Sequence, residues 1–143
     1  MTLDNNSYKI IDLPKIIDER GNLTFLENYK QIPFKIERVF WIYDMPGGTS
    51  RGGHAFYKQE ELIISLSGSF DVVITDENYN TKTITLNRPY YGLFISPKTW
   101  RHIENFSTNA LALHISNKKY SNQDYIRDFD LFKSIKKNES NNI

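Results

Sequence analysis

The chain of 143 residues contains no cysteine. This excludes disulfide bonds, thiolate metal ligands and cysteine nucleophiles, and it is compatible with a reducing compartment. No apolar run reaches the length of about 20 residues that a membrane-spanning helix requires. The segment from Met1 to Ile11 also lacks the basic and then apolar pattern of a secretion signal. We therefore expect a soluble, cytoplasmic protein with no membrane partner.

Excess charge of one sign is also lacking, because 18 Lys and Arg residues face 17 Asp and Glu residues, for a formal net charge of +1. Binding to a nucleic acid would require a broad basic face, so we expect no such partner. The sequence has no GxxxxGK loop, no GxGxxG and no GxSxG elbow. Nucleotide hydrolysis, dinucleotide redox chemistry and α/β-hydrolase action therefore lack their usual motifs.

Short runs of β-branched and aromatic residues, separated by turn formers, dominate the rest of the chain. Many short strands with no helical period between them favour an antiparallel sandwich or barrel. The predicted fold is therefore all-β, a jelly roll in a single domain over residues 1–132. We expect strands at residues 36–43, 61–67, 69–75, 81–86, 91–95 and 110–116.

The end of the chain changes character. Ser121 precedes Asp124 in an arrangement typical of a helix N-cap, which predicts a short C-terminal helical segment. Beyond Phe132 the sequence becomes rich in Lys and Asn, so residues 133–143 are predicted to form a solvated polar tail.

Two partial motifs are similar to the paired motifs of the cupins, a jelly-roll family. The first is represented by Gly48, His54, Glu61 and Gly68, and the second by Gly92, Pro97, Thr99, His102 and Asn105. The first motif usually contains His-x-His, but here Phe56 stands at the second histidine. We therefore predict a cupin domain whose usual metal-ligand set is incomplete.

Four stretches together resemble the sugar-nucleotide 3,4-ketoisomerases, which are cupins. They are Arg51 to Ala55, Leu66 to Ser69, Gly92 to Ile95 leading to Trp100, and Asp124 to Arg127 before Phe129, and the resemblance extends from Asp18 to Phe132. The resemblance implies a homodimer, often with exchanged N-terminal strands. It also implies a dTDP-linked 4-keto-6-deoxy sugar as substrate, transfer of the keto group from C4 to C3, and neither metal nor cofactor.

This reaction needs a base beside a ketone and a group that carries a proton between two adjacent oxygens. His54 suits the first task because histidine titrates near neutral pH. Residues two apart in a strand point to the same face, so Phe56 is expected beside His54, where it cannot transfer protons. The second acid or base stays open among the candidates Tyr43, Tyr57, Glu61 and His102.

Arginines are candidates for substrate binding. Arg51 is suited to hold a diphosphate through paired hydrogen bonds. The resemblance supports a role in substrate binding for Arg20 and Arg101. Many relatives have histidine at position 101, so the configuration of the product at C4 stays open. Trp100 can stack on thymine, although large aromatics more often pack in the core. The predicted substrate-binding set is Arg51, Arg20, Arg38, Arg101, Phe56, Glu61, Trp100 and His102.

Three alternatives remain beside the ketoisomerase. His54, Glu61 and His102 could form a two-histidine, one-carboxylate site for Fe, Mn or Zn. The protein could instead bind a sugar nucleotide without catalysis, or be a related epimerase acting at C3 and C5. His114 alternates with leucines in a predicted strand, a pattern more typical of a structural histidine, so we give it little functional weight.

Overall fold

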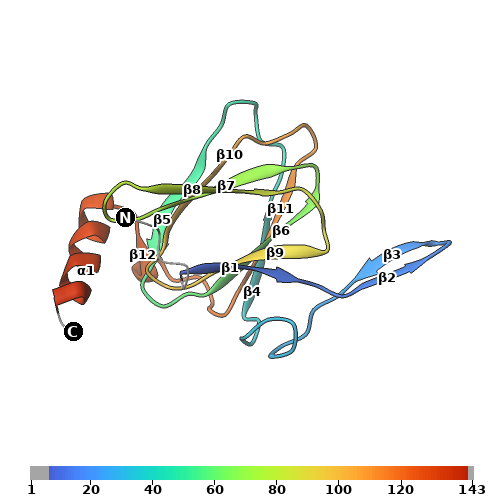
Figure 1. Ribbon diagram of the computed structural model, residues 1–143, viewed down its shortest axis with the longest axis horizontal. Coiled ribbons are helices and arrows are strands. Elements are labelled where there is room, and N and C mark those ends of the chain that lie inside the picture. The colour runs from blue at the N-terminus through green and yellow to red at the C-terminus, as the bar shows by residue number, and fades with distance from the viewer. Residues whose placement is uncertain (1–6, 142–143) are drawn as a thin grey trace.

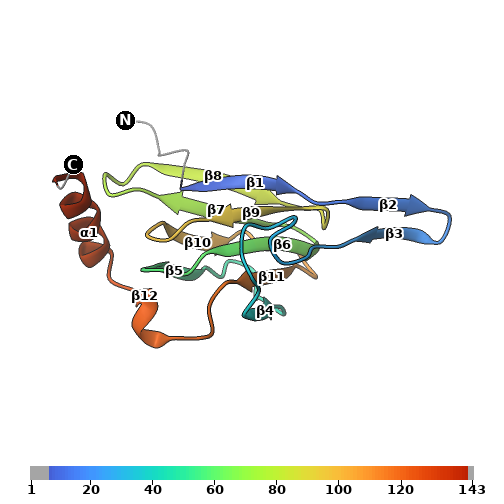
Figure 2. The same cartoon turned by 90° about the horizontal axis from the view of Figure 1, so that it is seen from below.

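The computed structural model describes residues 7–141 and consists mainly of two antiparallel sheets packed face to face (Figures 1 and 2). The first six residues of the segment expected to lack a secretion signal lie outside the described part. The all-β jelly-roll prediction is confirmed. The strands are β1 (Tyr8–Asp12), β2 (Lys15–Asp18), β3 (Gly21–Thr24), β4 (Arg38–Ile42), β5 (Arg51–Phe56), β6 (Glu61–Ser67), β7 (Phe70–Thr75), β8 (Thr81–Leu86), β9 (Tyr91–Ile95), β10 (Trp100–Glu104), β11 (Leu111–Ser116) and β12 (Tyr125–Ile126).

The first sheet has the strand order β1-β9-β6-β11-β4, and apolar residues cover both of its faces. Ile63 on β6 faces the sandwich interior, whereas Leu62 and Ile64 pack on the outer face with Ile32 and Phe34 from the segment before β4. This explains why β6 has a continuous apolar sequence rather than an alternating one.

The second sheet has the order β12-β5-β10-β7-β8. Its outer face is covered by helix α1 (Phe129–Asn141), where Trp100 packs against Phe129 and Phe132 with ring centroids 5.0 and 5.6 Å apart. The helix continues well past Phe132, so the predicted solvated tail is helical as far as Asn141. Ser121 precedes only a 3-10 turn, η1 (Asn122–Asp124), and makes no side-chain cap.

The sandwich interior is divided into two parts. An apolar cluster fills one part and is contributed by Ile63, Leu93, Ile95 and Ala112 of the first sheet and Phe70, Val72, Ile74, Leu86 and Ile103 of the second. The other part is a cavity with polar walls, which borders the cluster at Ile63 and Ile103. The apolar cluster therefore closes one side of the polar cavity.

The turn between β6 and β7 depends on Gly68. Its φ is +66°, and an added Cβ would clash with Ser107 Oγ and lie 2.9 Å from Ala110 Cα. Both the positive φ and the close approach therefore require glycine.

Strands β2 and β3 form a hairpin that projects from one end of the sandwich, opposite the end that carries α1 (Figures 1 and 2). Ile16, Ile17 and Leu23 of this hairpin are exposed. Within residues 7–141, no helix combines the length and apolar character needed to cross a membrane.

Candidate active site

A cavity of about 240 Å³ opens between the two sheets. One wall comes from β5, β10 and β12 and the other from β4, β6 and β11. The residues that line it are Phe40, Ile42, Arg51, Gly52, His54, Glu61, Ile63, Arg101, Ile103, His114, Tyr125 and Arg127. Charged and titratable groups are thus gathered inside an otherwise apolar sandwich.

A β-bulge in β5 brings Arg51 and His54 to the same cavity. Arg101 on β10 pairs with His54, and Ile103 pairs with Arg51, so that β5 has one residue more than β10 between the two pairs. Gly52 has a φ of +85° within this bulge. In a regular strand residues three apart point to opposite faces, but the extra residue turns both side chains to the interior.

His54 lies in an aromatic setting. Its ring centroid is 4.8 Å from that of Phe56 and 5.1 Å from that of Tyr125, and both pairs are edge-on. Phe56 is therefore beside His54, as the strand period predicts. Burial, followed by the nearby charge of Arg101, lowers the pKa of His54 from 6.5 to about 3. Its imidazole is consequently neutral at pH 7 and available to accept a proton.

Arg101 is almost completely buried, with 2% of its surface exposed. Its guanidinium lies over the Phe56 ring at 4.8 Å, and its Nη1 donates to the carbonyl oxygen of Thr99 at 3.3 Å. Its Nη2 lies 4.0 Å from Oε2 of Glu61 on the opposite wall. A buried cation thus connects the two walls of the cavity.

Glu61 is the anionic group of the cavity. Its Oε2 accepts a hydrogen bond from Gln59 Nε2 at 3.0 Å, and its Oε1 lies 2.5 Å from Nδ1 of His114. Burial alone would raise the pKa of Glu61, but His114 and Arg101 together outweigh it and lower the pKa to about 2. The carboxylate is therefore ionised near neutral pH.

Three predicted site residues face away from the cavity. His102 lies on the face of β10 opposite Arg101, with its Nε2 3.4 Å from Glu104. Trp100 lies on that same outer face beneath α1, where Tyr57 also packs. The alternation of the strand places these side chains outside. Since His102 points away from Glu61 and His54, the alternative metal site is not assembled, and no cluster of three potential ligands occurs within residues 7–141.

Tyr43, Arg20 and Arg38 also do not line the cavity. Tyr43 is 61% exposed beyond the end of β4. Arg20 lies at the tip of the β2–β3 hairpin, where its side chain is 90% exposed and paired with Asp18 at 2.8 Å. Arg38 faces inward, but its guanidinium stacks on Phe40 at 4.8 Å. Local sequence could not predict these positions because they depend on how the strands pack.

Three polar or titratable residues that line the cavity are absent from the predicted site: His114, Tyr125 and Arg127. Tyr125 and Arg127 belong to the stretch that carries the family resemblance, which was the available signal. Asp124 fixes this stretch, because its carboxylate accepts hydrogen bonds from the backbone N–H groups of Lys58 and Gln59 at 3.0 and 3.1 Å. Nothing in the pattern around His114 distinguished it from a structural histidine.

Known proteins share this architecture. A protein from Aneurinibacillus thermoaerophilus, named TDP-4-oxo-6-deoxy-alpha-D-glucose-3,4-oxoisomerase, is 40% identical over 125 residues, which cover 87% of this chain and 89% of that protein. The crystal structure of QdtA, a sugar 3,4-ketoisomerase from Thermoanaerobacterium thermosaccharolyticum in complex with TDP, superposes with a TM-score of 0.92 at 31% identity, covering 95% of this chain and 98% of that one. A 3,4-ketoisomerase from Helicobacter canadensis gives a TM-score of 0.85 at 41% identity, covering 90% and 96%.

The family described as FdtA, WxcM-like, C-terminal matches residues 6–137, which is nearly the whole chain. The resemblance predicted from the four stretches is thereby confirmed. The chain belongs to the FdtA family.

Proposed function

We propose that the protein is a sugar-nucleotide 3,4-ketoisomerase that converts dTDP-4-keto-6-deoxyglucose into a dTDP-3-keto-6-deoxyhexose. The observation that carries this proposal is the 40% identity, over 87% of the chain, to a protein named as a TDP-4-oxo-6-deoxyglucose 3,4-oxoisomerase. The cavity supports it, because a neutral histidine stands among arginines inside the jelly roll.

In this reaction His54 is the base that removes the proton from C3 of the sugar. Its uncharged ring is ready to accept this proton at neutral pH. The proton then returns to C4 of the resulting enediol, and the oxygen on C3 becomes the new keto group. His54 can deliver that proton from the same nitrogen, so no metal or cofactor enters the scheme.

Arg51 and Arg127 are proposed to bind the diphosphate. Both line the cavity, Arg51 is exposed, and a guanidinium matches phosphate oxygens through paired hydrogen bonds. Arg127 is oriented by a hydrogen bond from its Nη1 to Asn122 Oδ1 at 2.6 Å and lies 4.1 Å from the Tyr125 ring. The Tyr125 ring adds aromatic surface next to His54, whereas the predicted binding residue Phe56 is buried behind these rings and does not line the cavity.

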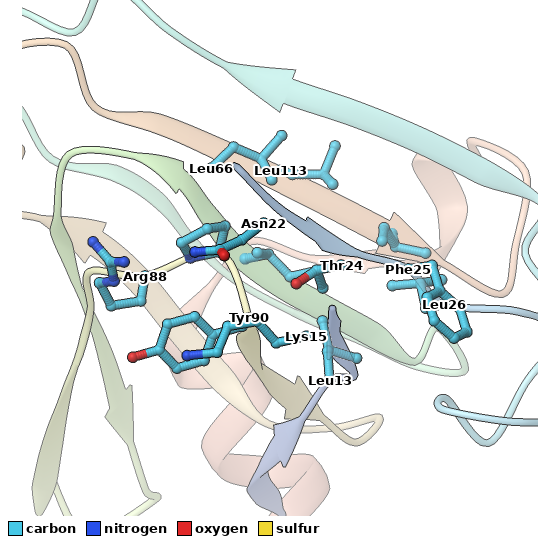
Figure 3. A pocket seen from close by; sticks show the side chains of 13 residues that line it. Leu13, Lys15, Asn22, Thr24, Phe25, Leu26, Leu66, Arg88, Tyr90 and Leu113 are labelled. Carbon is cyan, nitrogen blue, oxygen red and sulfur yellow. The ribbon is translucent and has the colours of Figure 1, made fainter. Parts of the chain in front are cut away.

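We also propose that two copies form a dimer through the β2–β3 hairpin. A groove of about 350 Å³ lies between the hairpin and the outer face of the first sheet. Ile17 of the hairpin is 67% exposed, and an interface with a second copy would bury it away from water. Figure 3 shows the groove with Lys15, Asn22 and Thr24 of the hairpin, Phe25 and Leu26 after it, and Leu66 and Leu113 of the sheet.

The dimer gives Arg20 a role that it lacks within one chain. We propose that Arg20, whose side chain is 90% exposed at the tip of the hairpin, enters the cavity of the second copy, which accords with the substrate role that the resemblance implies. Light scattering should give a dimer mass, and Ile17→Asp should shift the protein toward the monomer. An unchanged mass in this variant would exclude the hairpin as the interface.

The activity is tested by incubating the purified protein with dTDP-4-keto-6-deoxyglucose and following the sugar by proton NMR. We expect the 3-keto isomer, and the coupling constants of H4 will give the configuration at C4. Unchanged substrate together with normal binding of the dTDP-sugar would instead identify a non-catalytic binder. Activity that disappears with a chelator and returns with a divalent metal would overturn the metal-free scheme.

A further inference from the structure

A second histidine lines the cavity from the wall opposite His54. His114 lies in the middle of β11 and is only 4% exposed. Its ring stacks on Phe40, with centroids 4.5 Å apart and an angle of 14° between the planes. The ring is therefore held in one orientation within the cavity wall.

The two ring nitrogens of His114 have different surroundings. Nδ1 lies 2.5 Å from Oε1 of Glu61, whereas Nε2 is buried and has no hydrogen-bond partner in the described part of the chain. The carboxylate is held in place by Gln59 Nε2 on its other oxygen. An ionised carboxylate on Nδ1 keeps the proton on that nitrogen and directs the exchangeable position to Nε2.

A histidine with only a structural role would be expected to satisfy both nitrogens, because a buried polar atom without a partner is costly. Here the unpartnered atom belongs to a side chain that lines the same cavity as His54. The charged or titratable groups that face His114 are Glu61, with Arg101 on the same carboxylate, and His54 across the cavity, and the apolar Phe40 and Ile63 complete its surroundings. Apart from His54, which is assigned as the base, only His114 among these side chains has a ring nitrogen that can either donate or accept a proton.

We propose that His114 is the second acid–base catalyst of the ketoisomerase, exchanging a proton with the sugar oxygens through Nε2, and that Glu61 is its positioning residue. This proposal rests on the proposed function. His114 would be the proton carrier that Phe56 cannot be, and it comes from a strand that lies outside both cupin motifs.

The protons balance as follows. While His54 takes the proton from C3, protonated His114 donates its Nε2 proton to the C4 oxygen, which gives the enediol. Neutral His114 then accepts the proton of the C3 hydroxyl while His54 returns its proton to C4. C3 is oxidised to a ketone and C4 is reduced to an alcohol within one molecule, so no external oxidant or reductant is needed, and both histidines regain their starting states.

The main test is His114→Gln, which keeps a polar side chain but cannot carry a proton. We expect kcat to fall by a factor of about 10² to 10⁴, the usual range for loss of a general acid or base. The Kd for dTDP should not change, because the proposed role concerns the sugar oxygens. The matched control is His102→Gln on the outer face of β10, which should keep the parent kcat. Full activity of His114→Gln would overturn the proposal.

A rescue experiment separates proton transfer from packing. In the His114→Gln background, Phe56→His places an imidazole beside His54 on the same wall. We expect this double variant to recover at least about tenfold in kcat over His114→Gln alone. A purely structural role of His114 would give no recovery and would be accompanied by a lowered Tm and weakened dTDP binding, which would overturn the proposal.

Glu61→Gln provides a second variant if His114→Gln does not fold. This change leaves His114 in place but removes the negative charge on its Nδ1, so protonated His114 should be less stable. We expect the limb of the kcat–pH profile that reports the general acid to move to lower pH, with kcat reduced about tenfold or more at pH 7. A lower kcat with an unmoved pH profile would exclude the positioning role.

If the parent protein itself fails to isomerise the sugar, the proposed function fails, whereas an active parent with an unaffected His114→Gln variant rejects His114 alone.

Discussion

The cavity wall formed by β5, β10 and β12 differs from the wall formed by β4, β6 and β11 in how its polar groups reach the interior. On the first wall, a glycine-containing bulge turns Arg51 and His54 inward. On the second wall, Glu61 and His114 reach the interior from strands whose outer faces are also buried. The first wall is marked in the sequence by glycines, whereas the second resembles ordinary apolar strand.

The two walls also place their histidines in different electrostatic surroundings. His54 is only partly buried and carries no strong acceptor of its own, so its environment favours the neutral ring. Nδ1 of His114 is held against an ionised carboxylate, which leaves Nε2 as the nitrogen that faces no partner. The two histidines are thus suited to opposite roles, base and acid, across one small cavity.

The largest expected effect comes from removing the base on the first wall. His54→Asn should lower kcat by about 10³-fold, since in the described part of the chain no other histidine of that wall lines the cavity. The product is followed by NMR, and circular dichroism should show an intact fold. If the His54→Asn enzyme is active, the base lies on the second wall, and the base and acid roles assigned to the two walls are exchanged.

Removing the cation between the walls tests their electrostatic connection. Arg101→Met should lower the free energy of unfolding by about 3 kcal/mol, because the buried Glu61 carboxylate loses its cationic partner. Urea denaturation measures this, with Arg51→Met as the control, for which we expect a change below about 0.5 kcal/mol because Arg51 is exposed. Equal effects of the two changes would show that the walls are not coupled through Arg101.

The bulge itself can be tested with two adjacent glycines. Gly52→Ala should cost about 1–2 kcal/mol, because a residue with a Cβ is strained at a φ of +85°. Gly53→Ala is the matched control, since an added Cβ would lie 3.7 Å from Trp100, an ordinary contact. If both variants unfold at the same denaturant concentration, the positive φ of Gly52 is not needed for the bulge.

The pH dependence of stability tests the setting of His54 on the first wall. Unfolded His54 binds a proton below its ordinary pKa of 6.5, but folded His54 does so only below about 3. Unfolding therefore takes up a proton in this window, and stability should fall as pH decreases below 6.5, by at most about 1.4 kcal/mol per pH unit. Thermal unfolding of the parent and of His54→Asn between pH 7 and 5 should show a shallower slope in the variant. Parallel slopes would contradict the lowered pKa.

The strand structure of the second wall was partly predictable, although its chemistry was not. The strand expected at 61–67 has the same bounds as β6 in the structure, and outside the two walls the strand expected at 81–86 has the same bounds as β8. The hairpin β2–β3 was not predicted, and strands β5 and β10 were assumed around His54 and after Trp100 without bounds, because these exposed or bulged sequences lack a clear period. His114 was underrated because Leu113 and Ile115 are also covered on the outer face, so alternation carries little information there.

The sequence by itself determined the fold and the family and predicted His54 as the base, because turn glycines, strand periods and short motifs are local properties of the chain. Only the tertiary structure showed which second histidine lines the same cavity as His54. His102 has the expected motif position but points outward, whereas His114 lacks any motif yet stands against Glu61. The physical reason is that side-chain direction follows from strand parity and bulges, while the pairing of His114 with Glu61 joins residues 53 positions apart in the chain.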